Sequence, residues 1–494
     1  MDLEKRIEDS FLSSRCAVQE KDAAYTYRQL GAAVRFFRAY LVRSGVRRIM
    51  LCLPQSFQAY ALILSAYLAR VTYCPVDPDA PPYRKRYFVD VYRPDLIVTN
   101  SKTDFPDDLP APVIRLDAFC QDKLELPEPP APQAAQRGSE ENPPAYVIFT
   151  SGSTGMPKGV SVSRAVLRNF VSFGLEEYGV TPADVWGQFS KLSFDLSVFD
   201  IFVAVAAGAR LIPIASRGAK LLPARMIEKY GITYWHSVPS VMELIAFDRC
   251  GGQLNTLRIM NFAGEPLYPE IVKKLFAVNP TITIYNVFGH TETTFAMYQK
   301  LTAADYARYA DSTMSIGRPI PNYDVFLHNE RDGIGEIVIT GLIADGYIGE
   351  TAHTAFRTIL HNGVGERAFF SGDYAYSRRG NLYFWGRTDS QIKLRGNRID
   401  LNEIDNAFRV LGFRSATIYH QDAIVSFLLG DENAPARIRE GLLTILPEYS
   451  IPQKIVPVDT IPYNTNGKID RGALFQLLGK TEDSQGSVSF SAGA

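Results

Sequence analysis

A run of glycine and hydroxyl residues with one lysine follows directly after an apolar segment. Residues 150–160 read TSGSTGMPKGV, and the apolar segment AYVIFT ends at Thr150. Glycines let backbone N–H groups approach a polyphosphate, hydroxyl groups donate to its oxygens, and Lys158 adds a mobile positive charge. The run therefore predicts a loop for the β and γ phosphates of ATP, although it does not match the GxxxxGK[ST] pattern of a Walker loop.

An arbitrary run of glycine and serine is more often a flexible surface turn, but the order SGSTGMPKG is specific. It resembles the signature loop of the superfamily of acyl-CoA synthetases, amino-acid adenylation domains and firefly luciferase. The resemblance implies that ATP is the nucleotide and that Thr150 belongs to the catalytic residues. The residues that it assigns to nucleotide binding in this loop are Ser151, Gly152, Ser153, Thr154, Gly155 and Lys158.

The segment YNVFGHTETT resembles the NxYGPTE segment of the same superfamily. The resemblance implies that Asn286 meets the adenine edge, that Thr291 contacts the nucleotide, and that Glu292 binds Mg²⁺ and serves in catalysis. A hard cation prefers carboxylate and phosphate oxygens, so this role suits a glutamate. Phe288 stands where the superfamily has tyrosine and still offers a ring to stack on adenine, while His290 stands in place of proline.

Three further motifs of the superfamily have counterparts in the same order along the chain. FFSGDYAY implies that Asp373 binds the ribose hydroxyls, and GRTDSQIKLRGNRID implies that Arg387 contacts the ribose or phosphate side. The same segment makes Asp389 the hinge of a small C-terminal domain, and NTNGKIDR places Lys468 as the catalytic lysine. We expect rotation of the domain to remove Lys468 from the site and to bring residues 393–398 toward an incoming thiol.

The segment SFDLSVFDIF bears on whether the substrate is an amino acid or a plain carboxylic acid. It resembles a segment of peptide-synthetase adenylation domains and of D-alanine–carrier-protein ligases, whose aspartate pairs with the α-ammonium group of the substrate; here this is Asp195. A buried carboxylate beside a fatty acid would lack a partner, which is costly. A helix cap in a surface turn is the alternative for Asp195. The motif positions indicate a pocket formed by Asp195, Leu196, Phe199, His236, Asn261, Ala263, Val287, Phe295, Ala296 and Lys468.

The bulk of Phe199 and Phe295 predicts a pocket for a short side chain. We expect alanine first, then glycine or serine, then proline, with His236 and Asn261 as possible partners of a serine hydroxyl. His236 and His290 each have an alternative role as a packed or capping histidine.

The elements that must position these residues alternate between helical and strand-like patterns. QAYALILSAYLAR at 58–70 has the apolar spacing of a helix, whereas VTYCPVD at 71–77 and AYVIFT at 145–150 are typical of strands. Such alternation predicts an α/β fold with a buried parallel sheet. The resemblance adds that a large N-terminal adenylation domain of layered α/β subdomains precedes a small mobile α+β domain.

Shifts in composition predict the domain boundaries. The stretch 121–144 is rich in Pro, Glu, Gln and Ala, which is typical of an exposed connector. The polar run 386–405 separates the larger part of the chain from its last segment. We therefore expect an adenylate-forming core at 1–389, a lid domain at 390–480 and a disordered tail at 481–494.

The composition excludes several classes of protein. Of the 494 residues 46% are hydrophobic, and the formal charge of −1 gives no general field for nucleic acid or an anionic membrane. The N-terminus lacks the order of a secretory signal, and no apolar run is long enough to span a bilayer. We therefore expect a soluble, cytoplasmic protein. Its five cysteines are scattered without a CxxC pair, which predicts inert thiols and no zinc site.

The 494 residues contain no GGxSL-like attachment site for phosphopantetheine. The expected thioester acceptor is therefore a separate holo carrier protein, and free CoA is the alternative. Two other functions stay open at this point. One is an acyl- or aryl-CoA synthetase, in which Asp195 would be incidental. The other is a non-catalytic nucleotide-binding member of the fold, against which the intact Lys158, Glu292, Asp373 and Lys468 argue.

Overall fold

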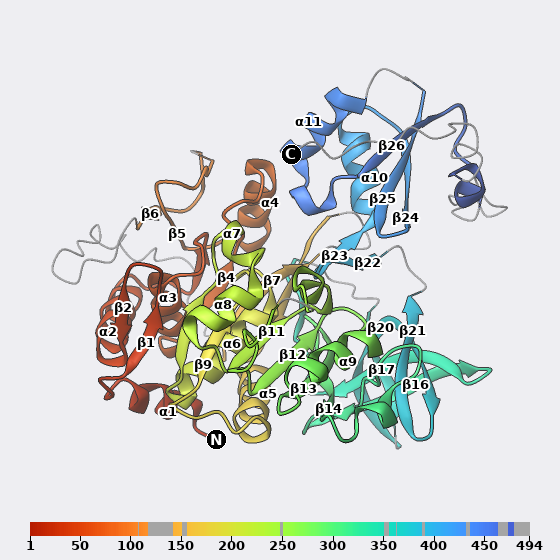
Figure 1. The fold of residues 1–494 in the computed structure, drawn as a ribbon. Helices are drawn as coiled ribbons and strands as arrows, with labels where there is room; N and C mark the ends of the chain where they lie inside the picture. Colours follow the sequence, from red (N-terminus) through yellow and green to blue (C-terminus); the bar gives the residue numbers. More distant parts are fainter. Residues whose placement is uncertain are drawn as a thin grey trace.

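The computed structural model describes residues 1–106, 108–116, 142–150, 156–247, 250–349, 355–361, 363–387, 391–430, 435–462 and 473–478. Within these residues the strands form five sheets (Figure 1). A large N-terminal domain holds three sheets, and a smaller C-terminal region holds the other two. This arrangement confirms the predicted α/β class. Asp389, residues 121–141 of the predicted connector and the predicted tail lie outside the described residues, so these boundaries stay predictions.

A seven-stranded sheet carries the strand that leads into the predicted phosphate loop. Its order is β18-β8-β7-β4-β3-β5-β6; the run from β7 to β6 is parallel, and β8 and β18 are antiparallel to their neighbours. Strands β4 and β7 lie where the sequence predicts strands. The bounds are β3 Arg48–Leu51, β4 Thr72–Pro75, β5 Leu96–Thr99, β6 Val113–Arg115, β7 Tyr146–Thr150, β8 Lys158–Val162 and β18 Gly346–Tyr347.

A nine-stranded sheet carries the other predicted site segments. Its order is β15-β14-β13-β12-β11-β9-β10-β1-β2, and the run from β13 to β1 is parallel. The bounds are β1 Cys16–Gln19, β2 Ala24–Thr26, β9 Val185–Gln188, β10 Arg210–Pro213, β11 Tyr234–Ser237, β12 Ile259–Ala263, β13 Thr283–His290, β14 Thr294–Leu301 and β15 Arg318–Pro319.

Two helices, α3 (Phe57–Leu68) and α6 (Asp195–Ala207), are buried around almost their whole circumference. In α3 every residue except Gln58 is buried. In α6 every residue from Ser197 to Ala206 is buried. A helix that is apolar on all sides belongs inside a protein. The largest apolar cluster accordingly joins these helices to residues of both large sheets.

The remaining helices cover the sheets, and no described helix is long and apolar enough to cross a membrane. The α-helices are α1 Leu3–Ser10, α2 Tyr27–Arg43, α4 Pro82–Tyr92, α5 Arg164–Glu177, α7 Arg217–Lys220, α8 Pro223–Tyr230, α9 Pro269–Val278, α10 Leu401–Val410 and α11 Pro435–Ile445. The 3₁₀ helices are η1 Pro239–Leu244, η2 Tyr306–Tyr309 and η3 Glu448–Ser450.

The third sheet and the C-terminal region follow in the chain. An antiparallel sheet contains β16 Tyr323–Arg331, β17 Ile334–Gly341, β19 Phe356–His361, β20 Val364–Arg378 and β21 Asn381–Arg387. The C-terminal region contains the hairpin of β22 Gln391–Leu394 and β23 Asn397–Asp400, then β24 Ser415–His420, β25 Ala423–Leu429 and β26 Lys454–Val458. It has apolar clusters of its own, and the hairpin lies at its junction with the rest of the molecule (Figure 1).

One carboxylate connects the residues just before three strands of the nine-stranded sheet. The site lies at the opposite ends of these strands. Asp184, just before β9, accepts hydrogen bonds from Thr233 Oγ1 at 2.8 Å and from Arg258 Nη2 at 3.0 Å, which lie just before β11 and β12. Although burial alone raises the pKa of Asp184, these donors, Arg258 first, hold its pKa below the usual value.

We predict that Asp184→Asn lowers the free energy of unfolding by about 2 kcal/mol, because Arg258 and Thr233 lose a charged acceptor. Since the pKa of Asp184 is lower in the folded chain, its contribution is present above the unfolded-state pKa of about 4 and is lost as the pH falls through the folded-state value. Denaturant titrations at neutral and acidic pH measure both effects. Asp9→Asn, on the exposed side of α1, is the control, and equal losses would contradict the prediction.

Candidate functional site

A cavity lies where the two large sheets meet the C-terminal region. Its volume is about 1240 Å³, including the solvent-filled space at its mouth. The ends of β4, β7 and β12, the start of α6, the β13–β14 turn and the β22–β23 hairpin form its walls. The carboxyl ends of parallel strands are where open α/β sheets bind ligands. The predicted site residues that line the cavity are Thr150, Asp195, Leu196, Ala263, Thr291 and Phe295.

The predicted phosphate loop joins two neighbouring strands at this cavity. Thr150 ends β7 and pairs across the sheet with Lys158, which begins β8. The ammonium group of Lys158 lies 5.1 Å from the centre of the Tyr347 ring. Residues 151–155, which the sequence assigns to phosphate binding, lie outside the described residues.

Glu292 is a buried carboxylate in the turn between β13 and β14. It is 1% exposed, and it accepts hydrogen bonds from Tyr347 Oη at 2.8 Å and from Arg398 Nη1 at 3.2 Å. Burial alone would raise the pKa of Glu292, but the charge of Arg398 and the other donors hold it below its usual value. Glu292 is therefore a charged oxygen ligand whose present counterion belongs to the C-terminal hairpin.

Asp373, on β20, is fully buried among three cationic or polar groups. Arg387 donates to its Oδ1, His290 Nε2 lies 2.9 Å from its Oδ2, and Lys393 Nζ lies 3.8 Å from Oδ2. Although burial opposes the charge, Lys393 and the other partners hold the pKa of Asp373 far below its usual value. Burial lowers the pKa of His290, and the cations of Lys393 and Arg398 lower it further despite Asp373.

A smaller hollow of about 410 Å³ adjoins the main cavity. Asn286, Val287 and Phe288, all predicted site residues, line it. Asn286 Nδ2 donates to the carbonyl of Ser315 at 2.8 Å, which leaves the amide oxygen directed elsewhere. The Phe288 ring makes an edge contact with the neighbouring His290 ring, with 5.2 Å between the ring centres. An aromatic ring and an amide in one recess suit a flat heterocycle.

Asp195 begins α6 on the wall of the main cavity. Its Oδ1 accepts from the backbone N–H of Leu196 at 3.0 Å, and no side chain in the part of the chain that the structure describes forms an ion pair with it. Burial, followed by the negative charge of Glu292, raises the pKa of Asp195. The geometry therefore presents a partly buried carboxylate toward the cavity whose negative charge is not balanced by a neighbouring cation among these residues.

Two phenylalanines limit the depth of the cavity beside Asp195. Phe295 lines the cavity, and the ring of Phe199 packs behind it with 4.5 Å between the ring centres. Phe199 is fully buried and rests on Gly174 of α5, where a Cβ would come within 2.5 Å of its ring. The pocket next to Asp195 is therefore short.

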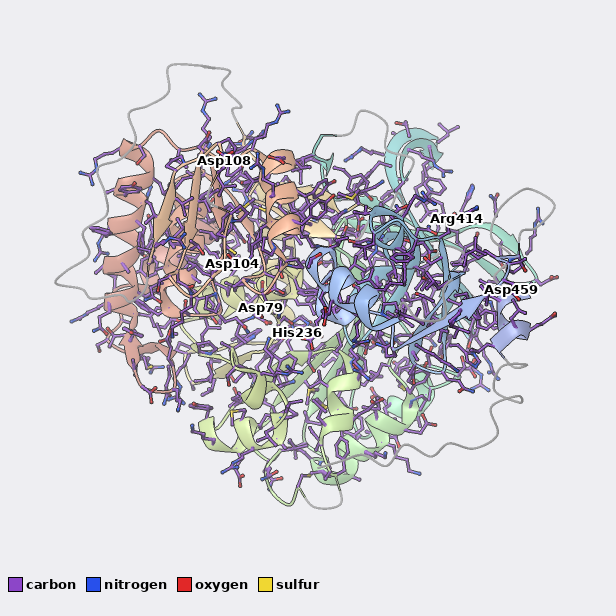
Figure 2. The ribbon with its side chains drawn as sticks, turned by 90° about the horizontal axis from the view of Figure 1, so that it is seen from above. Asp79, Asp104, Asp108, His236, Arg414 and Asp459 are labelled. Atoms are coloured by element: carbon purple, nitrogen blue, oxygen red, sulfur yellow. The ribbon has the colours of Figure 1, made fainter. Side chains whose placement is uncertain are left out.

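Four predicted pocket residues lie behind this wall instead of on it: Phe199, His236, Asn261 and Ala296 are all fully buried. Figure 2 shows His236 near the centre of the molecule, where its Nδ1 lies 2.8 Å from Asp200 Oδ1. Asn261, the register partner of His236 on β12, donates from Nδ2 to Tyr234 Oη at 3.1 Å. These polar side chains are packed residues of the core in this structure.

The C-terminal hairpin places its cations against the site. Lys393 and Arg398 line the cavity, together with Gly396 at the turn between the strands. The backbone N–H of Gly396 donates to Glu265 Oε1 at 2.5 Å. Lys393, Gly396 and Arg398 therefore face the site. The movement of residues 393–398 toward a thiol, which the resemblance implies, stays a prediction. Lys468 and Asp389 lie outside the described residues.

The sequence reasoning missed three partners of site residues: Asp200, Tyr347 and Glu265. Asp200 has a detectable signal, because it is the second carboxylate in the SFDLSVFDIF segment, five positions after Asp195. Tyr347 and Glu265 reach the site from segments without a recognised motif, so nothing local marks them.

The model of the AMP-binding enzyme family matches residues 9–348 of this chain. Surfactin synthase subunit 2 from Bacillus subtilis is 30% identical over 489 residues, which cover 93% of this chain and 13% of that protein. Bacitracin synthase 3 from Bacillus licheniformis is 29% identical over 476 residues, which cover 91% of this chain and 7% of that protein.

Solved structures share the fold along nearly the whole chain. The Vibrio cholerae adenylation domain AlmE, in complex with glycyl-adenosine-5'-phosphate, has a TM-score of 0.80 at 23% identity and covers 97% of this chain and 98% of its own. IdnL1 has a TM-score of 0.78 at 25% identity and covers 93% of this chain and 98% of its own.

The chain therefore belongs to the AMP-binding enzyme family, the AMP-forming class of adenylate-forming ligases. Within that class it is similar to the adenylation domains of nonribosomal peptide synthetases, although it spans only 13% and 7% of the two synthetases named above.

We predict that Asp373→Asn lowers the free energy of unfolding by about 3–5 kcal/mol, because Arg387 and Lys393 would keep buried charges without their counterion. The matched control is Asp324→Asn, since Asp324 Oδ2 lies 2.8 Å from His361 Nε2 but its side chain is 56% exposed. That variant should lose less than about 1 kcal/mol. Denaturant titration compares the two, and similar losses would refute the prediction.

Proposed function

We propose that this chain activates a small amino acid with ATP and transfers it to the phosphopantetheine thiol of a separate carrier protein. The observation that carries the proposal is Asp195, a carboxylate on the cavity wall without an ion-pair partner among the described residues. The α-ammonium group of an amino acid would balance its charge. A fatty or aromatic acid would leave the carboxylate partly buried and unpaired, which is unfavourable.

In the first half-reaction a carboxylate oxygen of the amino acid attacks the α-phosphorus of ATP. The bond from that phosphorus to the bridging oxygen breaks, and pyrophosphate leaves. Residues 150–155 and Lys158 are assigned to the phosphates, and Lys468 is assigned to the charges that develop at the reacting phosphorus. Catalysis of this kind rests on positioning and electrostatics. Asn286 and Phe288 line the smaller hollow, which supports their assignment to the adenine.

Glu292 fits a magnesium ion, because Mg²⁺ is usually held by one or two carboxylates together with substrate phosphates. The described residues contain no cluster of three His, Cys, Asp or Glu that could hold a metal without the substrate. When bound, the ion would neutralise charge on the phosphates. Since Arg398 now bonds to Glu292, we expect this role to require withdrawal of the hairpin.

In the second half-reaction the thiol sulfur attacks the acyl carbon, a thioester forms, and AMP leaves with the electron pair of the broken C–O bond. The hairpin at the cavity supports this step, because Lys393 and Arg398 lie on the wall and can offset the charge of the departing AMP. Rotation about Asp389 would exchange this arrangement for the one in which Lys468 serves adenylation.

The short pocket supports a small side chain, with alanine first, then glycine or serine, then proline. Phe295 closes the wall, and neither His236 nor Asn261 lines the cavity, which favours alanine or glycine over serine. The glycyl-adenosine-5'-phosphate bound to AlmE supports a small amino acid in a similar fold. A carrier protein as acceptor is supported by PA1221, which contains adenylation and PCP domains and matches with a TM-score of 0.79 at 24% identity over 96% of this chain.

The deciding experiment is ATP–pyrophosphate exchange by the purified protein with the standard amino acids, D-alanine and a panel of simple carboxylic acids. We expect exchange with one or a few small amino acids. Exchange driven only by acetate, benzoate or fatty acids would instead assign the chain to the acyl- or aryl-CoA synthetases. Nucleotide binding without any exchange would assign it to non-catalytic members of the fold.

We predict that Asp195→Ala lowers kcat/KM for the preferred amino acid by about 100-fold or more, because the buried α-ammonium group loses its counterion. Affinity for a non-hydrolysable ATP analogue should stay close to that of the unchanged protein, which separates loss of the acyl site from misfolding. An unchanged amino-acid profile in the exchange assay would contradict the role of Asp195.

A further inference from the structure

A buried ion pair between residues that are not among the predicted catalytic residues also joins the N-terminal domain to the C-terminal region. Arg84 Nη1, on α4, lies 2.5 Å from Glu403 Oε1, on α10. The two side chains are only 12% and 7% exposed, and they are 319 positions apart in the sequence. Such a pair exists only when the C-terminal region is docked as it is here.

The packing around this pair is also specific to the docked arrangement. Helix α11 contacts α4, and in Figure 1 it lies above α4 and to its right. Tyr449, in η3, lines the cavity with Arg84, and it lies close enough to the pair for the charges of Arg84 and Glu403 both to act on its pKa. Glu403 itself is not part of the cavity wall. The Arg84–Glu403 pair therefore helps to fix the orientation of the C-terminal region, and with it the position of the β22–β23 hairpin.

Removal of one partner has a predictable direction. In the docked arrangement a lone Arg84 or a lone Glu403 would stay buried without a counterion, whereas rotation of the C-terminal region would expose it to water. Removal of one partner of a buried ion pair has a large free-energy cost, whereas replacement of both charged groups by uncharged ones changes the stability little. A single substitution should therefore disfavour this orientation, and the double substitution should restore part of it.

We propose that the Arg84–Glu403 pair is a positioning contact for the transfer half-reaction, which holds the C-terminal region so that Lys393 and Arg398 face the acyl pocket. The pair separates when the region rotates for adenylation. The assignment to a half-reaction rests on the function proposed above, whereas the effect of the pair on orientation does not depend on the substrate.

The orientation can be measured by a cross-link at the tip of the hairpin. A Cβ placed on Gly396 would lie 3.5 Å from the Cβ of Val238, the residue before η1, and this distance is within the range of a disulfide. A cysteine at position 396 is strained because φ there is +78°, but this strain is the same in every variant compared. Val238→Cys with Gly396→Cys therefore forms the background of every variant, and its rate of oxidation reports how often this orientation is populated. Each single cysteine substitution serves as the blank for the native thiols.

The variants compare a buried with an exposed pair between the same two parts. Glu403→Gln and Arg84→Gln each remove one partner of the buried pair. Glu448→Gln is the matched control, because Arg217 and Glu448 also pair across this boundary, but at 3.9 Å with side chains 86% and 78% exposed. Combining Arg84→Gln with Glu403→Gln tests for rescue.

We expect Glu403→Gln and Arg84→Gln each to slow the cross-link by about tenfold or more, the double variant to recover much of the rate, and Glu448→Gln to change it by less than about twofold. Equal rates in all variants would overturn the proposal, as would a double variant as slow as its singles. Thermal unfolding of each protein excludes loss of the fold as the cause.

The two half-reactions then test the role. Glu403→Gln should keep ATP–pyrophosphate exchange within about twofold but lower thioester formation with pantetheine, the probe thiol, by about tenfold. Equal losses in both half-reactions would overturn the assignment to transfer. Absence of amino-acid exchange in the unchanged protein would refute the proposed function, yet the cross-linking result would still decide whether the pair controls orientation.

Discussion

A carboxylate buried as completely as Asp373 stays charged only if cationic and hydrogen-bonding partners surround it, and this requirement brings three parts of the chain together. Its partners His290, Arg387 and Lys393 come from β13, β21 and β22. The nine-stranded sheet, the antiparallel sheet and the C-terminal hairpin therefore converge on one side chain. The shape of the cavity, and the place of the hairpin in it, depend on this convergence.

The three carboxylates of the site differ in what balances their charge. Asp373 is paired with Arg387 of the N-terminal domain and with Lys393 of the hairpin, whereas Glu292 is paired with Arg398 of the C-terminal region. Asp195 forms no ion pair with a cation among the described residues. This difference suits the proposed chemistry. Asp195, which would receive the ammonium group of the substrate, has no competing cation among the described residues. Glu292, which is assigned to a metal ion, has a partner that can move away with the hairpin.

Local patterns predicted the elements, but they did not predict the pairing between distant segments. The segments 58–70 and 145–150 form a helix and a strand as their apolar spacing predicts, and motifs identified the residues at the ends of the strands. The polar run 386–405 was predicted to separate two parts, and its motif implied that residues 393–398 move toward an incoming thiol, but the hairpin that residues 391–400 form was not predicted. The pairs Arg84–Glu403 and His236–Asp200 could not be predicted, because contacts between distant segments leave no periodic signal in either one. His236 and Asn261 share a face of β11 and β12, but they are packed behind two aromatic rings and do not reach the cavity. No spacing in the sequence reveals this packing.

The contact between Phe199 and Gly174 has a consequence for how substrate choice changes in proteins of this architecture. Since any side chain at position 174 would displace the Phe199 ring, the depth of the pocket is set in part from helix α5, by a residue that no substrate touches. Two chains with the same wall residues can thus accept acids of different length. A comparison of wall residues alone would assign both chains the same preference, and the helix behind the wall would have to be included to tell them apart.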